Sequence, residues 1–494
     1  MSEIGFKKIL VANRNEIAVR IIRTLKELGI TSVAIYSDAD EDALHVRLAD
    51  EKYYLGPPEP AHSYLDIDRI VEIAVEAGVD AVHPGYGFLS QNPMFAEKLE
   101  EKGIIFIGPP PSVQRLVGDK LGARRFFHSH GVPVVPGTFK PVSIKDAESI
   151  AEEIGFPVMV KPVAGGGGIG MFIAHNVQEL RDRIERARKL ASKAFGSIEV
   201  YIERYFPRAK HIEVQILGDK YGNIVHLFER ECSVQRRFQK VIEESPSPSI
   251  TEEERERLLG YGVLAAKSSG YVNAGTFEFL FDVNERKFYL LEVNSRIQVE
   301  HPVTEMITGI DIVEEQIRIA DGKELSFKQE EVSRRGHAIE ARLYAEDPVN
   351  NFIPSPGKIK VLREPSGPWI RVDSGVYSGY VVPEHYDPLL MKVISWGSTR
   401  IQAIRRLRRA LNELIVSGVK TNKFLLLRIL EHKEFIEGKY TTRFLDDKRE
   451  IYTDLKSEDI VEEREERKEP EKAPRREGVA NAWRAAARLG IGGG

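Results

Sequence analysis

Short apolar, β-rich runs alternate with stretches of helical spacing over the first part of the chain. The runs lie at residues 7–12, 31–37, 80–85 and 104–109, and the helical patterns at residues 17–28 and 66–77. This alternation is typical of a parallel, doubly wound sheet, which binds ligands beyond the carboxyl ends of its strands. We therefore predict a Rossmann-like domain over residues 1–135, with Asn13, Arg14 and the turn at 83–87 at its ligand-binding edge. For Asn13 alone, an ordinary role in a turn is the better explanation.

The pattern of apolar positions changes near residue 136. Two β-rich runs, at 157–162 and 171–175, flank a series of glycines, which predicts a mobile hairpin loop. Further β-rich runs between residues 211 and 294 predict a large antiparallel sheet with one helical insertion. We expect residues 136–330 to form a second domain, in which residues 136–205 are a lid and the sheet holds the chemistry.

The last third of the chain has a mixed pattern. Short strands and turns follow a helical stretch at 310–320, and a further helix is predicted at 399–416, so we expect a third, α+β domain over residues 331–446. Residues 447–478 are mostly charged and predict a solvated linker. Residues 479–494 place apolar side chains on one helical face, which predicts a short amphipathic helix. The fold class expected is a multidomain mixture of α/β and α+β units.

Composition limits the classes of protein to which the chain can belong. Its 494 residues exceed one typical domain several times over, in agreement with the multidomain pattern. Hydrophobic residues make up 42% and charged residues 30%, and a net charge of -4 gives no sign of a nucleic-acid binder. The apolar stretches are shorter than the roughly 20 residues of a membrane helix. A lone Cys232 fits a reducing compartment, so we predict a cytoplasmic protein without nucleic-acid or membrane partners.

Two features point to nucleotide chemistry. Consecutive glycines at 165–168 let backbone N–H groups approach phosphate oxygens, with Lys161 nearby as a cation, although a flexible surface loop has the same composition. Glu278 and Glu292 lie in otherwise hydrophobic runs, and Asn294 follows the second of them. Such oxygen ligands suit Mg²⁺ bound to nucleotide phosphates, whereas the alternative is a pair of half-exposed strand glutamates.

Polar and apolar residues alternate in the segment that follows Asn294. If the segment is extended, Arg296, Gln298 and Glu300 face one way and offer a cation, an amide and a base in one row. Lys240 adds a cation near the β-rich core. A structural ladder of salt bridges would have the same pattern.

The sequence resembles a known family, the ATP-grasp biotin carboxylases, over about residues 7–445. The motifs that carry the resemblance occur in the family's order: KILVANRNEIAVR, HPGYGFLS, FIGP, GDK, KPVAGGGGIGM, ERECSVQRRFQK, EVNSRIQVEHPVTE, GHAIEARLYAEDP and PSPGKI. The resemblance implies a pre-ATP-grasp domain, an ATP-grasp domain with a glycine-loop lid, and a C-terminal biotin carboxylase domain. The positions that depart from the family's usual residues are Asn15, Gln91, Ile169, Arg204 and Phe238.

The resemblance also implies a role for each candidate residue. It implies nucleotide contacts by Lys120, Lys161, Gly165, Gly166, Gly167, Gly168, Glu203, Phe206, His211 and Gln235. It implies that Mg²⁺ or Mn²⁺ is held by Glu278, Glu292 and Asn294. It implies that bicarbonate is bound by Lys240, Arg296, Gln298 and Val299, that Glu300 is the base that deprotonates it, and that Arg342 stabilises the biotin enolate.

The implied reaction begins when bicarbonate attacks the γ-phosphate of ATP to give carboxyphosphate, which then carboxylates biotin. The sequence contains no Ala-Met-Lys-Met biotinylation site, so we expect biotin on a separate carrier or carboxyltransferase chain, and a homodimer of this chain. The expected enzyme is a two-subunit pyruvate carboxylase, with an acetyl-CoA or propionyl-CoA carboxylase as the alternative. Another ATP-grasp ligase, or a nucleotide-binding regulatory subunit without turnover, is less expected.

Overall fold

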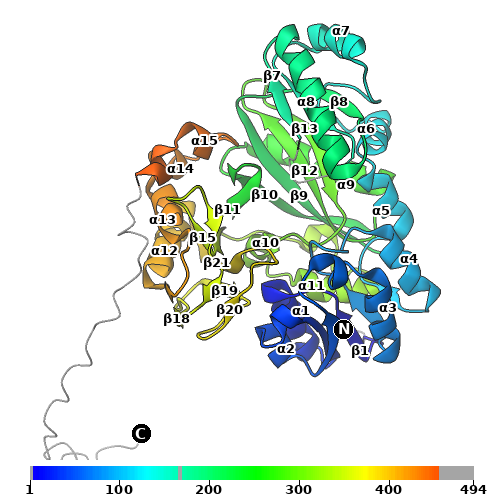
Figure 1. Cartoon of the computed structure of the whole chain (residues 1–494), viewed down its shortest axis with the longest axis vertical. Helices are drawn as coiled ribbons and strands as arrows, with labels where there is room; N and C mark the ends of the chain where they lie inside the picture. The colour runs from blue at the N-terminus through cyan, green and yellow to red at the C-terminus, as the bar shows by residue number, and fades with distance from the viewer. Residues whose placement is uncertain (1–3, 165–169, 455–494) are drawn as a thin grey trace, which may run out of the picture.

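The computed structural model describes residues 4–164 and 170–454 (Figure 1). The glycine run at 165–168, predicted to be a mobile loop, and Ile169 lie outside the described residues. So do the charged linker from residue 455 onward and the amphipathic helix predicted at 479–494. Within the described ranges, no helix is long and apolar enough to cross a membrane.

The N-terminal part is built on a parallel sheet, as its alternating pattern predicts. Five strands pair in the order β3-β2-β1-β4-β5, and every pair is parallel. The strands are β1 (Lys8–Val11), β2 (Thr31–Ser37), β3 (Glu51–Gly56), β4 (Ala81–His83) and β5 (Ile105–Phe106). The helices are α1 (Asn15–Glu27), α2 (Leu44–Leu48), α3 (Ile67–Glu76) and α4 (Pro93–Glu101). Strand β1 is apolar throughout its central residues because both of its faces are buried.

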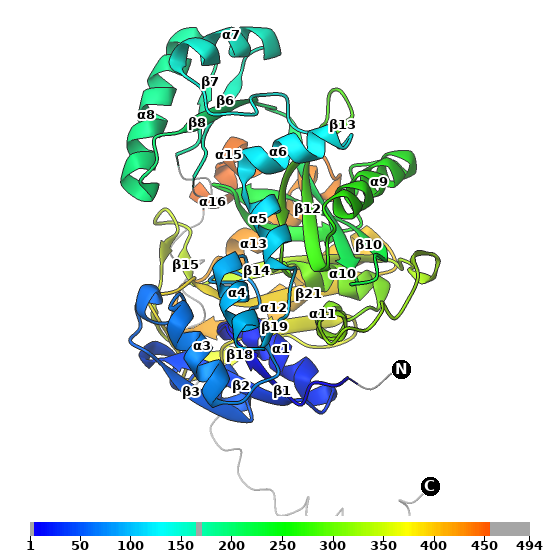
Figure 2. The same ribbon diagram turned by 90° about the vertical axis from the view of Figure 1, so that its right-hand side faces the viewer.

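An eight-stranded sheet forms the centre of the molecule, with strand order β13-β12-β9-β10-β11-β14-β21-β19 (Figures 1 and 2). Its strands are β9 (Ala209–Gly218), β10 (Ile224–Arg236), β11 (Gln239–Ser245), β12 (Asn273–Asp282), β13 (Lys287–Asn294), β14 (His337–Tyr344), β19 (Ile370–Ser374) and β21 (Leu389–Gly397). The antiparallel pairing of β11 with β14 makes the sheet continuous across residue 330. The second and third predicted domains therefore share one sheet.

A smaller unit stands above this sheet at the top of Figure 1. It holds the three-stranded sheet β7-β6-β8, with β6 (Val158–Pro162), β7 (Phe172–Ala174) and β8 (Val200–Arg204). Helices α7 (Ile144–Ile154) and α8 (Val177–Phe195) cover it. Strands β6 and β7 pair antiparallel, which confirms the hairpin predicted around the glycine run.

The remaining elements connect these sheets or cover them. The longer helices are α5 (Pro111–Gly118), α6 (Lys120–Ser129), α9 (Glu252–Ser268), α10 (His301–Thr308), α11 (Ile312–Ala320), α12 (Arg400–Glu413) and α13 (Lys423–Glu431). The short elements are β15 (Glu346–Asp347), β16 (Ile353–Pro354), β17 (Gly357–Lys358), β18 (Val361–Arg363), β20 (Val381–Val382), β22 (Ile415–Ser417), α14 (Lys433–Ile436), α15 (Phe444–Asp447) and α16 (Glu450–Thr453). The helix predicted at 399–416 ends at Glu413, because residues 415–417 pair with β18 instead.

Helix α1 begins at a residue that joins the N-terminal sheet to the central one. Asn15 has a φ of 58°, in the left-handed region that favours glycine. Its side-chain amide donates a hydrogen bond of 2.5 Å to the carbonyl oxygen of Leu389, at the start of β21. Asn tolerates this backbone conformation better than other side chains, so here it serves as a glycine substitute that also makes a contact between domains.

We expect Asn15→Ala to destabilise the protein by about 1–3 kcal/mol, because alanine keeps the backbone strain and loses the hydrogen bond. Asn15→Gly is the matched control, since it loses the same hydrogen bond but accepts a positive φ. Thermal unfolding should give a lower midpoint for the alanine variant than for the glycine variant. Equal midpoints would show that the backbone conformation carries no cost.

Candidate active site

A cavity of about 710 Å³ lies between the central sheet, helices α5 and α6, and the strand β6 of the upper unit. This volume is in the range of pockets that enclose small ligands. Most of the candidate residues line it: Lys120, Lys161, His211, Gln235, Lys240, Glu278, Glu292, Asn294, Arg296, Gln298, Val299 and Arg342. Glu203, Phe206 and Glu300 are buried and are not part of the cavity lining.

The ammonium group of Lys240 is the centre of the site. Its Nζ lies 2.6 Å from Glu213 Oε2, 2.9 Å from Glu278 Oε1 and 2.6 Å from Glu300 Oε1. Burial by itself lowers the pKa of Lys240, but the three carboxylates outweigh that effect and raise the pKa well above its ordinary value. Lys240 is therefore a permanent cation in a pocket of acids.

Strand geometry brings these side chains together. Glu213 on β9 is in register with Glu278 on β12, and Glu278 is in register with Glu292 on β13. Residues in register on adjacent antiparallel strands face the same side of the sheet. Carboxylates placed so closely repel one another, and cations from neighbouring strands offset that repulsion. Lys240 extends from β11, and Arg230 of β10 lies 2.5 Å from Glu213 Oε1.

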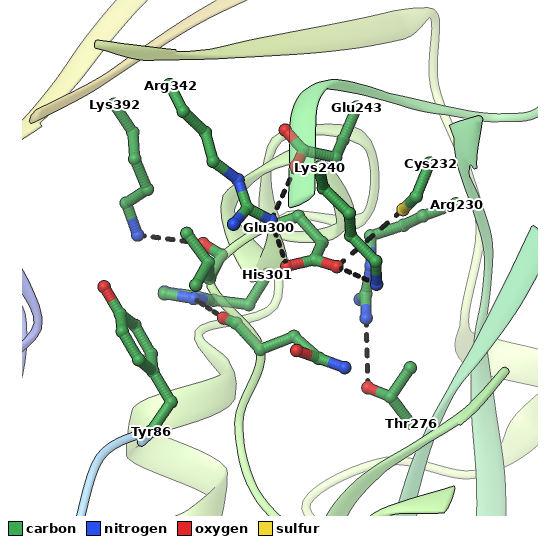
Figure 3. Close-up of polar contacts among 12 residues, drawn as sticks. Tyr86, Arg230, Cys232, Lys240, Glu243, Thr276, Glu300, His301, Arg342 and Lys392 are labelled. Carbon is green, nitrogen blue, oxygen red and sulfur yellow. Dashed lines mark hydrogen bonds and ion pairs between the residues drawn. The ribbon is translucent and has the colours of Figure 1, made fainter. Parts of the chain in front are cut away.

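Glu300 is fully buried immediately before the first turn of α10. Figure 3 shows its carboxylate between Lys240 and Arg342, with Arg342 Nη2 at 2.9 Å from Oε2. The thiol of Cys232 lies 3.7 Å from Oε1. Burial and the charge of Glu213 raise the pKa of Glu300, but Lys240 and Arg342 outweigh them and hold it below its ordinary value. Glu300 is therefore ionised at neutral pH, as a general base must be.

The segment that carries Arg296, Gln298 and Glu300 is not the extended row that alternation suggests. Strand β13 ends at Asn294, and the chain turns at residues 299 and 300. Arg296 Nη1 nevertheless donates to Gln298 Oε1 at 2.8 Å, and Gln298 Nε2 donates to Glu278 Oε1 at 3.0 Å. Arg296 and Gln298 therefore contact each other and Glu278 although the strand has ended, and Glu300 follows at the turn.

The proposed metal ligands Glu278, Glu292 and Asn294 lie on one wall of the cavity. Asn294 Nδ2 donates to Glu278 Oε1 at 2.9 Å. Glu292 is exposed to the cavity, but the protein around it limits its contact with water, and this desolvation together with the charge of Glu278 raises its pKa. A divalent cation would offset that repulsion, so the oxygen donors fit Mg²⁺. A group formed by His211, Glu213 and Glu278 has its ligand atoms within 4.8 Å of one another, but Lys240 already occupies its acids.

Two further lysines in the cavity lining, Lys120 and Lys161, suit an anion. Lys120 opens α6 and its Nζ donates to the carbonyl of Pro162 at 3.4 Å. Burial lowers the pKa of Lys120, and the neighbouring cation Lys161 lowers it further. A phosphate group between the two ammonium groups would reverse this effect. In this structure Lys161 forms an ion pair with Glu203, which also forms one with Arg124.

The two remaining nucleotide candidates occupy different positions. Phe206 is buried and stacks on Tyr289, with ring centroids 5.2 Å apart and planes at 17°. Gln235 lies in the cavity wall, where its Nε2 is 3.1 Å from His211 Nδ1. Glycines 165–168, the other proposed phosphate contacts, lie outside the described residues.

Besides Asn15, three departures from the family's usual residues can be placed. Gln91 Oε1 accepts a hydrogen bond of 3.0 Å from the backbone N–H of Ser295, which ties the N-terminal domain to the end of β13. Phe238 lines the cavity, is 57% exposed and has a φ of 68° at the β10–β11 turn. Arg204 is paired with Glu285, outside the cavity lining.

Sequence reasoning missed four residues that are buried around Glu300 or Lys240: Glu213, Arg230, Cys232 and Glu243. Figure 3 shows the last three of them. A usable signal existed for Glu213. His211, Glu213 and Gln215 alternate with apolar residues along β9, which marks a polar face on a strand that is buried throughout. Glu243 gives no such signal, because the neighbouring Glu244 is also buried but faces the opposite side of the sheet.

The chain matches three family models along its length. Residues 5–114 match the biotin carboxylase N-terminal domain, residues 119–328 the ATP-binding domain of the carbamoyl-phosphate synthase L chain, and residues 340–447 the biotin carboxylase C-terminal domain. Biotin carboxylase 1 of Bacillus subtilis is 50% identical over 441 residues, which cover 89% of this chain and 98% of that protein. The chain belongs to the biotin carboxylase family. It is thus an enzyme, an ATP-grasp ligase component that carboxylates biotin at the expense of ATP.

Other biotin carboxylases differ in the acceptor that their names state. A pyruvate carboxylase subunit of Methanothermobacter thermautotrophicus is 52% identical over 445 residues, 90% of each chain. The biotin carboxylase domain dimer of the 2-oxoglutarate carboxylase of Hydrogenobacter thermophilus, solved with MgADP, ADP and bicarbonate, is 48% identical with a TM-score of 0.87. That match covers 90% of this chain and 98% of the other. The shared fold confirms the fold class expected from the sequence.

We expect Lys240→Met to destabilise this biotin carboxylase by about 3–5 kcal/mol, because it leaves buried carboxylates without their cation. The matched control is the double variant Lys240→Met with Glu213→Gln, which removes one of the stranded charges. Thermal unfolding should show a lower midpoint for the single variant than for the double variant. A single variant as stable as the wild type would mean that the carboxylates are compensated by other groups.

Proposed function

We propose that this site joins bicarbonate to the γ-phosphate of ATP as carboxyphosphate and transfers the carboxyl group to biotin carried on a partner protein. The observation that carries the proposal is that Lys240, Arg296, Lys120 and Lys161 all line one cavity, and that Lys240 contacts the buried carboxylate of Glu300. An acid held ionised beside an anion-binding cluster suits the activation of bicarbonate.

Glu300 is the proposed general base. Bicarbonate bound by Lys240, Arg296, Gln298 and the backbone of Val299 would place its hydroxyl near this carboxylate. Glu300 accepts the proton as a bicarbonate oxygen attacks the γ-phosphorus, and ADP leaves. Because Lys240 also contacts Glu300 at 2.6 Å, the ammonium group remains beside the acid while the acid changes charge.

Cations around the cavity offset the charge on the transferring phosphoryl group. Lys120 and Lys161 are the proposed phosphate ligands, and Glu278, Glu292 and Asn294 would hold Mg²⁺ or Mn²⁺. The metal ion, when bound, supplies positive charge at the phosphate oxygens. The protein's own contribution is to keep this charge fixed in a walled cavity, where it is worth more than in water.

Arg342 is the proposed partner of biotin. It lines the cavity while its guanidinium group lies 2.9 Å from Glu300 and 2.6 Å from Glu243. These two acids fix an otherwise mobile side chain. When carboxyphosphate breaks down to CO₂ and phosphate, the phosphate takes the ureido proton, and Arg342 stabilises the enolate oxygen that forms.

Glu300→Gln should lower bicarbonate-dependent ATP cleavage by roughly 10²- to 10⁴-fold, the usual loss when a general base is removed. Nucleotide affinity should change little, because Glu300 lies outside the cavity lining. Glu253→Gln, at an exposed carboxylate on α9, is the matched control and should retain activity. Unchanged turnover in the Glu300 variant, with the protein folded, would refute the assignment.

Glu292→Gln should raise the Mg²⁺ concentration needed for half-maximal activity, because it removes an oxygen ligand. The thermal midpoint should not fall, since the variant also removes the repulsion between Glu292 and Glu278. Glu278→Gln is the comparison: it should shift the Mg²⁺ requirement in the same direction but also disturb Lys240. Mg²⁺ titrations that overlay the wild type in both variants would mean that the carboxylates are structural.

We infer that the biotin belongs to a separate carrier or carboxyltransferase chain and that the present chain acts as a homodimer within that assembly. A two-subunit pyruvate carboxylase is the proposed context, supported by the name of the relative from Methanothermobacter thermautotrophicus. An acetyl-CoA or propionyl-CoA carboxylase is the alternative. A pull-down should recover a biotinylated chain, and carboxylation of pyruvate by the pair decides the acceptor.

A cytoplasmic location stays a prediction based on the lone cysteine.

A further inference from the structure

A fully buried lysine on β21 holds the loop that carries Glu300. The side chain of Lys392 is 0% exposed, and its Nζ donates a hydrogen bond of 2.9 Å to the carbonyl oxygen of Val299. In Figure 3, Lys392 and Lys240 lie on opposite sides of this loop. Lys240 contacts the carboxylate of Glu300, whereas Lys392 contacts the peptide group that immediately precedes it.

Acids from two other elements hold the ammonium group of Lys392 in place. Glu16, in the first turn of α1, lies 3.1 Å away, and Asp373 on β19 lies 3.7 Å away. Tyr86, from the loop after β4, donates its hydroxyl proton to the other oxygen of Glu16. The Glu300 loop is thereby connected to the N-terminal domain through a chain of buried polar contacts.

Lys392, Glu16 and Asp373 differ in how strongly each depends on the others for its charge. Burial lowers the pKa of Lys392, but Glu16, Glu340 and Asp373 outweigh that effect and raise it, so the lysine remains a cation. Burial raises the pKa of Glu16 to about 7, against the opposing effect of Lys392. Asp373 has a second cation, because Arg371 makes two hydrogen bonds of 2.8 Å to it. Asp373 therefore does not depend on Lys392 alone for a cation, although Arg371 is shared with Glu305.

The peptide contacted by Lys392 occupies a sensitive position. It joins Val299, a proposed bicarbonate contact, to the proposed base, and it lies in a turn with no strand to fix it. A displacement of about 1 Å at a reacting group can cost on the order of 10²-fold in rate. A buried donor on this carbonyl orients the peptide group that joins the two residues.

We propose that Lys392 is a positioning residue for the bicarbonate step, which orients the Val299–Glu300 peptide and transmits the placement of α1 and β21 to the site. This inference rests on the function proposed above for Val299 and Glu300. The competing explanation is that Lys392 only neutralises acids where the domains meet.

The test uses the full chain and compares Glu16→Gln with the double variant Glu16→Gln, Lys392→Met. The single variant keeps the donor to Val299, and glutamine resembles the protonated form that Glu16 reaches near neutral pH. The double variant removes the donor and the cation together without leaving Glu16 as an unpaired acid. The KM values for bicarbonate and for ATP and kcat are measured from bicarbonate-dependent ATP cleavage, and folding is followed by thermal unfolding.

The double variant should show at least a roughly 10-fold fall in kcat/KM for bicarbonate relative to Glu16→Gln, while KM for ATP stays within about 2-fold. Equal bicarbonate kinetics in the two variants would overturn the proposal, as would a parallel loss of ATP affinity. If the double variant does not fold, Lys392→Arg is assayed instead, since it keeps the cation between Glu16 and Asp373 but moves the donor atoms. The same selective fall would support positioning, and wild-type bicarbonate kinetics would overturn it. A wild-type protein without bicarbonate-dependent ATP cleavage would overturn the proposed function and this inference together.

Discussion

The ammonium group of Lys240 determines how the rest of the site can be arranged. Three buried carboxylates meet at it, and none of them could stay ionised in that position without a cation. One of them, Glu300, is the proposed base, and another, Glu278, is a proposed metal ligand. Because Lys240 contacts both, it holds the proposed base Glu300 close to the proposed metal ligand Glu278. Arg230 and Arg342 supply the further positive charge that lets this acidic cluster be buried in a continuous sheet.

The regular periodicity of the strands and helices made much of the fold predictable. Alternation of β-rich and helical segments correctly predicts the parallel N-terminal sheet, and the hairpin around the glycine run follows from its two flanking strands. The continuity of the central sheet could not be predicted, because β11 and β14 are separated by almost one hundred residues and pair through backbone groups common to every sequence. The left-handed backbone conformation of Asn15 could not be predicted from the hydrophobic pattern either, because the pattern carries no information on φ.

The candidate site shows the same division. Glu278 and Glu292 were selected because both lie in apolar strand runs, where a buried carboxylate is costly. Glu278 is buried, whereas Glu292 is exposed to the cavity. Glu300 was identified from an alternation that the backbone does not follow: the strand ends at Asn294 and a turn brings Glu300 to Lys240. The polar face of β9 could have pointed to Glu213. Lys392 gives no such signal, because its partners Val299, Glu16 and Asp373 come from distant elements. The charge network thus emerges only when the N-terminal domain, the upper unit and the central sheet come together.

The central claim is that bicarbonate, not water, attacks the γ-phosphate of ATP in this cavity. The most direct measurement uses bicarbonate labelled with ¹⁸O in unlabelled water, with quenching before the label exchanges, and mass analysis of the phosphate released during biotin-dependent turnover. Attack by a bicarbonate oxygen places a single labelled oxygen in each phosphate, because the P–O bond formed in carboxyphosphate survives when CO₂ leaves. Phosphate that contains oxygen from water only would contradict the account.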